Sequence, residues 1–395
     1  MLNSRVTGLF LFLIFASFTH TSSIAAKQLS DPAYVPIIAA PEYSAPPVVL
    51  FDHGHNNFHR ADGKYSGFRD LLTADGYNVR SIDGAFATVD PNTGLPVETA
   101  FDREKGKARL LVIASACGAL GQTPEEACAF NPSALTDLEV QKILTWVRSG
   151  GSLLLIFDHA PYDHVVNLAS ALGIDIYGSA LYNESPIITF TRQTGLNSNS
   201  SLVNGRSANE SISHVKIFNG SAFRLGASLP SDAIYQPLLT LPAGTNSDTG
   251  ASLAGASMGM AIRLGAGRVY VSGEAAMFTA QTGTDGAGRV RAFLGLSDLS
   301  ASYNAQYLRN IIHWLDGRIF EPQLDKNGAD LAVTSVRGSV VGSTHRLRLA
   351  YTVCNFGNMS SNAAADMGLF LSEDETITIS DPMSRYVSVP ALAPR

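Results

Sequence analysis

The chain predicts an α/β protein followed by a small all-β module. Short apolar runs alternate with amphipathic helical segments between residues 48 and 315. Ser, Asn, Thr and Gly dominate residues 174–250, and short strand-like segments separated by turns follow residue 329. Alternating strands and helices form a parallel sheet with helices on both faces, because right-handed crossovers return each helix to the sheet. The expected fold is a flavodoxin-like three-layer sandwich with a β-rich insertion, followed by a partial immunoglobulin-like β-sandwich.

The bulk composition is that of a folded protein. Hydrophobic residues make up 45% of the 395 residues and charged residues 16%, which is enough apolar material for a core and too little charge for disorder. The formal net charge is −6, with acidic and basic residues interspersed. No basic stripe is available to neutralise phosphates, so nucleic acid is not an expected partner.

The N-terminus has the pattern of a signal peptide. Arg5 is followed by an apolar run over residues 9–18, and small residues at positions 23–26 offer a cleavage site. This run is too short to span a bilayer, and no later segment approaches the roughly 20 apolar residues of a membrane helix. We therefore expect residues 1–26 to be removed, residues 27–46 to be a linker, and the mature protein to be secreted, periplasmic or at the cell surface without a membrane span.

Apolar runs at residues 48–51, 110–114 and 153–157 predict strands of a sheet that is covered on both faces, and residues 78–82 read as a further strand. Helical spacing predicts helices over residues 65–76 and 165–172. The clearest helix begins at Thr136, where Glu139 completes a capping box, and it ends at Gly150.

The second half of the main domain is predicted in the same way. The insertion should contain strands at residues 187–190, 214–218 and 235–241. Residues 259–264 and 268–272 read as consecutive strands joined by a glycine-containing turn. A helix over residues 303–314 closes a domain that we bound at residues 47–322. Residues 323–328 are an expected linker, and residues 329–395 an incomplete all-β module.

Export permits disulfides, and the chain has three cysteines. Cys117 and Cys128 lie in one loop-rich stretch and are candidates for a disulfide. The alternative, a nucleophilic role for Cys117, lacks a G-x-C-x-G context. Cys354 lies in a strand pattern and is expected to be a lone thiol.

The loops after the predicted parallel strands carry the candidate site residues. In an open parallel sheet these loops converge at the carboxyl edge and form the ligand crevice. They span residues 52–59, 158–164 and 273–278, and the first two hold five of the nine histidines. Asp and His are ligands for zinc and related divalent metals, and they are also the acid–base groups that work near neutral pH.

Three interpretations of these loops remain open. A divalent metal such as zinc would be bound by Asp52, His53 and His55. Catalysis would use Asp158 and His159, with Glu274 as general base. The same residues could instead line a polar ligand cleft or act only as structural hydrogen-bonding groups, and no H-E-x-x-H motif selects a metal. His59 and His164 lie further along their loops and are the weaker candidates.

The stretches "GGSLLLIFDHAP", "GRVYVSGEAAMF" and "NAQYLRNIIHWLDG" resemble the class I glutamine amidotransferase-like superfamily. The closest likeness is to an uncharacterised branch of exported bacterial proteins, over residues 47–322. Working amidotransferases carry a cysteine nucleophile on the turn after the strand that matches residues 153–157. Here that turn contains Asp158 and His159 and no thiol, so the resemblance implies the fold and its cleft without the amidotransferase reaction. Glu274 falls near the position of the family's acidic or histidine partner.

The tail resembles the CARDB module, an immunoglobulin-like domain of bacterial surface and secreted proteins. The matching stretches are "ADLAVTSVRGSVVG", "LRLAYTVCNFGN" and "GLFLSEDETITISD", and the later strands of the family are absent. The resemblance implies a role in adhesion or spacing.

Three functions are consistent with these patterns. The first is an exported protein whose Asp/His cleft binds a small polar ligand, such as a sugar or a peptide-derived compound. The second is a metal-assisted hydrolase that uses the Asp/His cluster. The third is an adhesion or scaffold protein without catalysis, whose tail contacts a cell-surface component.

Overall fold

The computed structural model describes residues 27–38, 41–43, 46–118, 128, 133–160, 163–285, 287–319, 331–341, 346–355, 361, 365–370 and 383–392. The predicted signal peptide at residues 1–26 and the predicted linker at residues 323–328 lie outside these ranges. No helix within them is long and apolar enough to cross a membrane.

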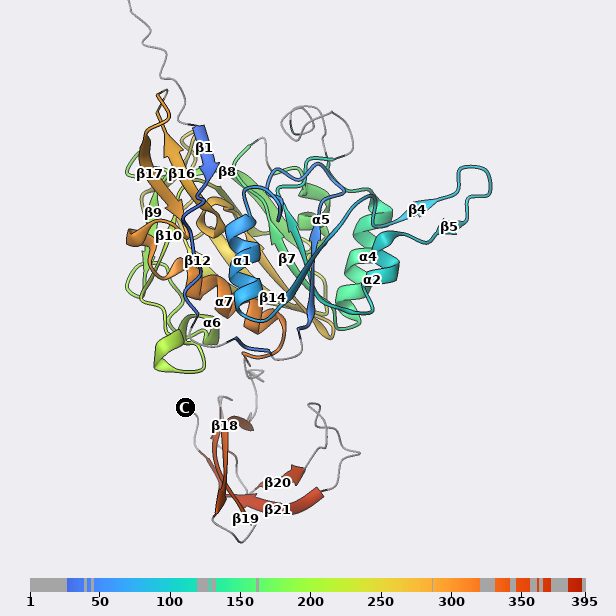
Figure 1. Cartoon of the computed structure of the whole chain (residues 1–395), viewed down its shortest axis with the longest axis vertical. Helices are drawn as coiled ribbons and strands as arrows, with labels where there is room; N and C mark the ends of the chain where they lie inside the picture. Colours follow the sequence, from blue (N-terminus) through green and yellow to red (C-terminus); the bar gives the residue numbers. More distant parts are fainter. Residues whose placement is uncertain are drawn as a thin grey trace, which may run out of the picture.

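The described chain forms a mixed α/β fold around a ten-stranded sheet (Figure 1). Five neighbouring strands are parallel and occur in the order β3-β2-β6-β7-β15. They are β3 (Asn78–Ile82), β2 (Val48–Asp52), β6 (Ala108–Ala114), β7 (Ser152–Ile156) and β15 (Gly267–Ser272). The four strands predicted at residues 48–51, 78–82, 110–114 and 153–157 are therefore adjacent in one sheet.

Antiparallel strands continue the sheet beyond β15. The hairpin of β14 (Ser257–Leu264) with β15 confirms the predicted pair of consecutive strands. Next to β14 come β11 (Ser221–Leu225), β8 (Ile174–Tyr182) and β13 (Thr245–Ser247), and β12 (Ala233–Thr240) also pairs with β14. Most of the predicted insertion therefore extends the central sheet through main-chain pairing, which its polar composition did not indicate.

The remainder of the insertion forms small elements. A hairpin joins β9 (Ile188–Thr191) to β10 (His214–Ile217), close to two of the predicted strands. The short helix α6 (Ser201–Asn204) and the 3-10 turn η1 (Ala208–Glu210) lie between them in sequence.

Further short strands were not predicted. A three-stranded sheet contains β1 (Lys27–Ser30), β16 (Ala280–Thr284) and β17 (Val290–Gly295). The expected linker at residues 27–46 thus begins with a strand, because its first four residues pair antiparallel with β16. The hairpin of β4 (Thr88–Val89) and β5 (Pro96–Val97) protrudes from the domain (Figure 1).

Helices cover both faces of the sheet. Along β2, Val49 and Phe51 join one core with α1 (Ser66–Ala74) and α7 (Asn304–Leu315). Val48 and Leu50 point to the other face, where a second core contains α4 (Asp137–Arg148) and α5 (Val166–Ala171), with α2 (Ala100–Glu104) packed nearby. Side chains alternate between the faces of a strand, so a continuous apolar run supplies both cores.

The predicted capping box of α4 is present. The Thr136 hydroxyl accepts the amide of Glu139, and the Glu139 carboxylate accepts the amide of Thr136. The cap satisfies amides at the first turn of the helix, and it also fixes the direction of the Glu139 side chain.

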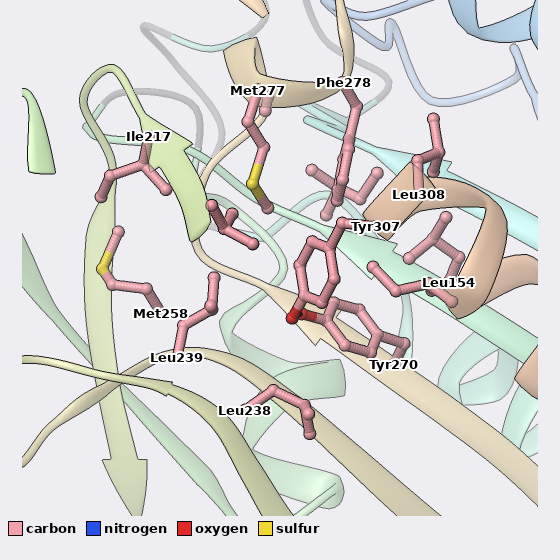
Figure 2. Close-up of a cluster of buried hydrophobic side chains, with 14 of the residues drawn as sticks. Leu154, Ile217, Leu238, Leu239, Met258, Tyr270, Met277, Phe278, Tyr307 and Leu308 are labelled. Carbon is pink, nitrogen blue, oxygen red and sulfur yellow. Dashed lines mark hydrogen bonds between the residues drawn. The ribbon is translucent and has the colours of Figure 1, made fainter. Parts of the chain in front are cut away.

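The core on the α7 face is largely aliphatic and aromatic, and a pair of tyrosines forms a polar contact inside it. Figure 2 shows Tyr270 of β15 and Tyr307 of α7 meeting at their hydroxyl groups among Leu154, Phe278 and Leu308. Both tyrosines are fully buried, so each hydroxyl depends on the other for its hydrogen bond.

The C-terminal part forms two antiparallel pairs. One joins β18 (Leu331–Val341) to β19 (Arg346–Asn355), and the other joins β20 (Ala365–Phe370) to β21 (Met383–Val389). The described residues of this part therefore agree with the predicted all-β character of residues 329–395.

Candidate functional site

A buried histidine between two carboxylates lies at the end of β2. His55 Nδ1 donates to Asp52 at 2.9 Å, and His55 Nε2 donates to Glu139 Oε1, also at 2.9 Å. All three side chains are almost completely buried. Asn57 donates to the second oxygen of Asp52, and the amide of Phe86 donates to Glu139 Oε1. Every polar atom of the histidine ring is therefore engaged.

The electrostatics of this triad favour a permanent ion cluster. Burial by itself would lower the pKa of His55, but the neighbouring carboxylates of Asp52 and Glu139 raise it to about 10. Burial opposes ionisation of Glu139, yet hydrogen bonds from His55 and Thr136 lower its pKa to about 2. The imidazolium joins the end of β2 to the start of α4, which is a structural role.

His53 faces away from this triad. Its Nε2 accepts the amide of Ala61 at 3.1 Å and lies 3.3 Å from the hydroxyl of Ser81 at the end of β3. Burial, and then the positive charge of Arg60, lower the pKa of His53. The ring is thus held as a neutral hydrogen-bonding group on the β3 side of the sheet.

The predicted metal ligands are not arranged as a metal site. Within the described ranges, no three His, Cys, Asp or Glu side chains are arranged to hold a metal ion. His55 uses both ring nitrogens on carboxylates, and His53 uses Nε2 on the backbone. The geometry instead assigns Asp52, His53 and His55 to hydrogen-bond networks. His164 is structural in the same sense, because its Nε2 donates to the carbonyl of Cys128.

Asp158 and His159 follow β7, two strands away from β2. The Asp158 carboxylate accepts a hydrogen bond from the backbone amide of His159 at 2.8 Å and another from Nδ1 of the His159 ring at 2.9 Å. The Asp158 side chain is 7% exposed, whereas that of His159 is 35% exposed. Burial raises the pKa of Asp158, and the hydrogen bond that His159 donates to Asp158 raises the pKa of His159. The dyad therefore connects a buried carboxyl group to the protein surface.

Glu274 follows β15 and is completely buried. Its Oε2 accepts the amide of Met277 at 2.8 Å, while its Oε1 is buried with no hydrogen-bond partner in the described structure. Burial and then the charge of Asp158 raise the pKa of Glu274 well above its ordinary value. The two carboxyl groups thus lie near enough to oppose each other's ionisation.

Glycines allow the close packing that creates this pair. A Cβ on Gly220 would meet the carbonyl of Gly273 at 2.3 Å and the Cβ of Glu274 at 2.7 Å. The Ser221 hydroxyl beside it donates to the carbonyl of Asp158 at 3.2 Å. The start of β11 thereby holds the ends of β7 and β15 together.

His59 connects the first loop to this pair. Its Nδ1 lies 2.9 Å from the hydroxyl of Ser115, the residue that follows β6, and both side chains are buried. Burial, and then the charges of Lys64 and His159, lower the pKa of His59 to about 3. Because β6 lies between β2 and β7, His59 is the histidine of the first loop that comes within electrostatic range of His159.

Lys64 and Tyr65 complete the cluster. The Tyr65 ring packs on His59 at 4.9 Å between centroids, and its hydroxyl donates to the carbonyl of Ala275. Burial, and then the charges of Glu274 and Asp158, raise the pKa of Tyr65. The positive charge of Lys64 contributes to lowering the pKa of His59, and it opposes the rise in the pKa of Asp158. The Lys64 ammonium lies 3.1 Å from the ring centroid of Phe58.

The site therefore differs in membership from the sequence prediction. Asp158, His159 and Glu274 come together as predicted, whereas Asp52, His53 and His55 do not join them. His59 was considered a weaker candidate, and Lys64, Tyr65 and Ser115 were missed. Ser115 could have been found from its place at the end of a predicted strand. Lys64 and Tyr65, at the start of a predicted helix, carried no comparable signal.

Two surface hollows of the described residues lie elsewhere. One of about 430 Å³ is lined by Lys107, Arg109 and Trp146, near the amino ends of β6 and β7. The other, of about 350 Å³, lies between the end of β3 and α2. Neither is lined by Asp158 or Glu274.

The predicted disulfide is present beside the site. Cys117 and Cys128 are bonded and buried. The amides of Cys117 and Gly118 both donate to the carbonyl of His55 at 2.9 Å. The disulfide loop is thereby attached to the loop that carries His59.

Comparisons with known proteins give only distant likenesses. No protein-family model matches the chain, and no curated protein matches it. Among solved structures, a putative ThuA-like protein from Parabacteroides merdae is 12% identical with a TM-score of 0.38, over 71% of this chain and 94% of that one. A cytoplasmic protein from Salmonella typhimurium is 12% identical with a TM-score of 0.36, over 68% of this chain and 98% of that one.

Two glycoside hydrolases are similarly distant. The exo-β-1,4-mannosidase of an Opitutaceae bacterium is 14% identical with a TM-score of 0.31, over 58% of this chain. The β-galactosidase of Rahnella sp. R3 is 11% identical with a TM-score of 0.37, over 88% of this chain. The chain spans 31% of the mannosidase and 40% of the β-galactosidase. At these scores the likenesses carry no argument about this protein's activity.

Proposed function

We propose that this protein is exported and binds a small polar ligand, a sugar or a peptide-derived compound, at the carboxyl edge of its parallel strands. The central residues are Asp158 and Glu274, with His159 at the surface. The order of the five parallel strands supports a flavodoxin-like layout, in which ligands bind in the crevice outside the carboxyl ends.

The buried pair of carboxyl groups carries this proposal. Burying an ionisable group costs stability, and Glu274 is completely buried within range of the charge of Asp158. Titratable groups with strongly shifted pKa values cluster at functional sites. In the Asp52–His55–Glu139 triad, by contrast, a histidine lies between the two carboxylates and donates to both.

Two observations support export. The N-terminal sequence has the pattern of a signal peptide. The Cys117–Cys128 disulfide is typical of an oxidising compartment.

Ligand-induced thermal stabilisation tests the binding site. The probes are a panel of monosaccharides, disaccharides and short peptides, added to the full mature chain. A ligand present at a hundred times its Kd stabilises by about 2.7 kcal/mol, which raises Tm by several degrees. The isosteric variants Asp158→Asn and Glu274→Gln should stay folded and lose this response.

Asp232→Asn is the matched control. Asp232 pairs with Arg148 on the surface and lies outside the site, so this variant should respond as the wild type does. A panel that never shifts the wild type, or site variants that respond normally, would refute the proposal.

We also propose that residues 329–395 act as an adhesion-type module. The two antiparallel strand pairs and the CARDB-like sequence support this role. Removing the residues after 328 should abolish attachment of the protein to the cell surface. Unchanged attachment of the shortened protein would exclude this role.

A further inference from the structure

The amino ends of the central parallel strands border a surface hollow that takes no part in the function proposed above. It has a volume of about 430 Å³, within the range of about 300–1,000 Å³ that is typical of small-molecule pockets. Its lining includes Lys107 and Arg109 around the start of β6, Trp146 of α4, and glycines at positions 106, 150 and 151. Asp158 and Glu274 follow the carboxyl ends of β7 and β15, so the hollow lies at the opposite edge of the sheet.

Two cationic side chains line this hollow together. Lys107 and Arg109 are separated by Ala108, the first residue of β6, and alternate residues of an extended chain point to the same side. Both side chains are largely exposed. An anion in the hollow can therefore reach both positive charges from the solvent.

Each of the two cations has an acidic neighbour, and neither pair is tight. Lys107 Nζ lies 3.4 Å from Glu104 Oε1, and the other oxygen of Glu104 accepts from Arg80 at 3.2 Å. Arg109 Nε lies 4.0 Å from Asp316 Oδ1, which is longer than a hydrogen bond. Exposed ion pairs contribute little free energy, so a ligand with a higher negative charge can replace them at small cost.

The Asp316 carboxylate lies inside the protein. Its side chain is almost completely buried, and its Oδ2 accepts the hydroxyl groups of Tyr43 and Tyr77. Asp316 is not among the residues that line the hollow. A ligand there would meet the Arg109 guanidinium and not this carboxylate.

Trp146 supplies the aromatic part of the lining. Its Nε1 donates to the carbonyl of Lys105 at 3.2 Å. Its ring lies against Gly151, where an added Cβ would come within 2.4 Å of the indole carbons. The ring is thus held in one orientation beside the two cations, and small-molecule pockets typically combine such an aromatic surface with a few polar groups that orient the ligand.

The C-terminal end of α4 also borders the hollow, and free carbonyls there would repel an anion. These acceptors are occupied. The carbonyl of Trp146 accepts the amides of Ser149 and Gly151. The carbonyl of Val147 accepts the amide of Gly150. The helix end therefore presents fewer free acceptors to a ligand than an uncapped end would.

We propose that this hollow binds a phosphate group, with Arg109 and Lys107 contacting its oxygens and Trp146 bordering the rest of the ligand. A guanidinium presents paired donors that match phosphate oxygens. A phosphate monoester carries a charge of about −1.5 to −2 at pH 7, which is enough to engage both cations at once, whereas a carboxylate carries a single charge. Inorganic phosphate and the phosphate ester of a small sugar share this chemistry.

Calorimetry on the mature chain at pH 8 distinguishes these ligands. The probes are D-glucose 6-phosphate, inorganic phosphate, D-glucuronate and D-glucose. At least one phosphate probe should bind, and bind more tightly than glucuronate. Tighter binding of the sugar phosphate than of inorganic phosphate identifies an ester as the ligand, and equal binding identifies free phosphate.

Charge-removing variants assign the binding to the hollow. Arg109→Gln and Lys107→Gln should each weaken binding of the phosphate probes about ten-fold, because each removes a charged donor. Arg289→Gln is the matched control and should bind as the wild type does. Arg289 is 69% exposed against 68% for Arg109, and it pairs with Asp285 beside β16, in another sheet.

Gly106→Leu tests the hollow itself. A Cβ at this position would meet nothing within 4 Å beyond its chain neighbours in the described structure, so a leucine side chain can enter the space without displacing other residues. This variant should keep the Tm of the wild type and lose affinity for the phosphate probes.

The contrary outcomes are specific. Phosphate affinities that are unchanged in Arg109→Gln, or lowered equally in Arg289→Gln, exclude the hollow as the phosphate site. Glucuronate that binds as tightly as the phosphate probes and responds equally to Arg109→Gln overturns the choice of phosphate. Binding of neutral D-glucose belongs to the carboxyl edge and should be the same in Arg109→Gln, so these outcomes leave the function proposed above untouched.

Discussion

At the scale of single residues, His55 shows how a histidine can be essential to the fold while taking no part in ligand binding. It joins Asp52 and Glu139 in a buried ion cluster. Removing one partner of a buried ion pair leaves an uncompensated charge and typically costs about 3–5 kcal/mol. We expect His55→Gln to lower the free energy of unfolding by about 3 kcal/mol at pH 6, measured by urea denaturation.

The pH dependence of the same variant has a definite sign. A histidine whose pKa is raised on folding stabilises fully below its unfolded pKa of about 6.5, and this contribution disappears as pH rises through about 10. Glu139 acts in the other direction, stabilising above about pH 4.5 and losing that effect as pH falls through about 2. The difference in stability between wild type and His55→Gln should therefore be largest near pH 5–6 and shrink by pH 9. A difference that grows from pH 6 to pH 9 would contradict the assignment.

At the scale of elements, the hydrogen bond between Tyr270 and Tyr307 attaches helix α7 to strand β15 of the sheet. Tyr307→Phe leaves the Tyr270 hydroxyl buried without a partner, which should cost about 1–2 kcal/mol. Replacing both tyrosines by phenylalanine removes the pair together, so the double variant should be nearly as stable as the wild type. Urea denaturation of the two single variants and the double variant gives the coupling free energy. Simple additivity of the two losses would contradict the contact.

At the scale of the whole molecule, the Cys117–Cys128 disulfide connects stability to the cellular compartment. The bond closes a loop with a sequence separation of 11, for which chain entropy predicts about 2–3 kcal/mol. The double variant Cys117→Ala/Cys128→Ala should lose this amount, and dithiothreitol should lower the Tm of the wild type but not that of the variant. Cys354→Ala is the control and should keep the response to the reductant. A wild type that is insensitive to reduction would argue against the bond.

Local pattern predicted much of the molecule. Consecutive apolar residues such as Leu153, Leu154 and Leu155 mark a buried strand because both faces of the sheet are covered. Thr136 and Glu139 mark a helix start because a cap is a contact over three residues. The pairing of Cys117 with Cys128 and the hairpin of β14 with β15 were predicted for the same reason, since their partners are close in sequence.

The roles of the histidines could be decided only in three dimensions. The sequence by itself determined an α/β chain with Asp and His residues on the loops after its strands. The tertiary structure decided that His55 lies between Asp52 and Glu139, although Glu139 is 84 residues further along the chain. It also decided that His59 contacts Ser115, the residue that follows β6. Strand order sets which loops meet, and strand order depends on long-range packing that a short window of sequence does not contain.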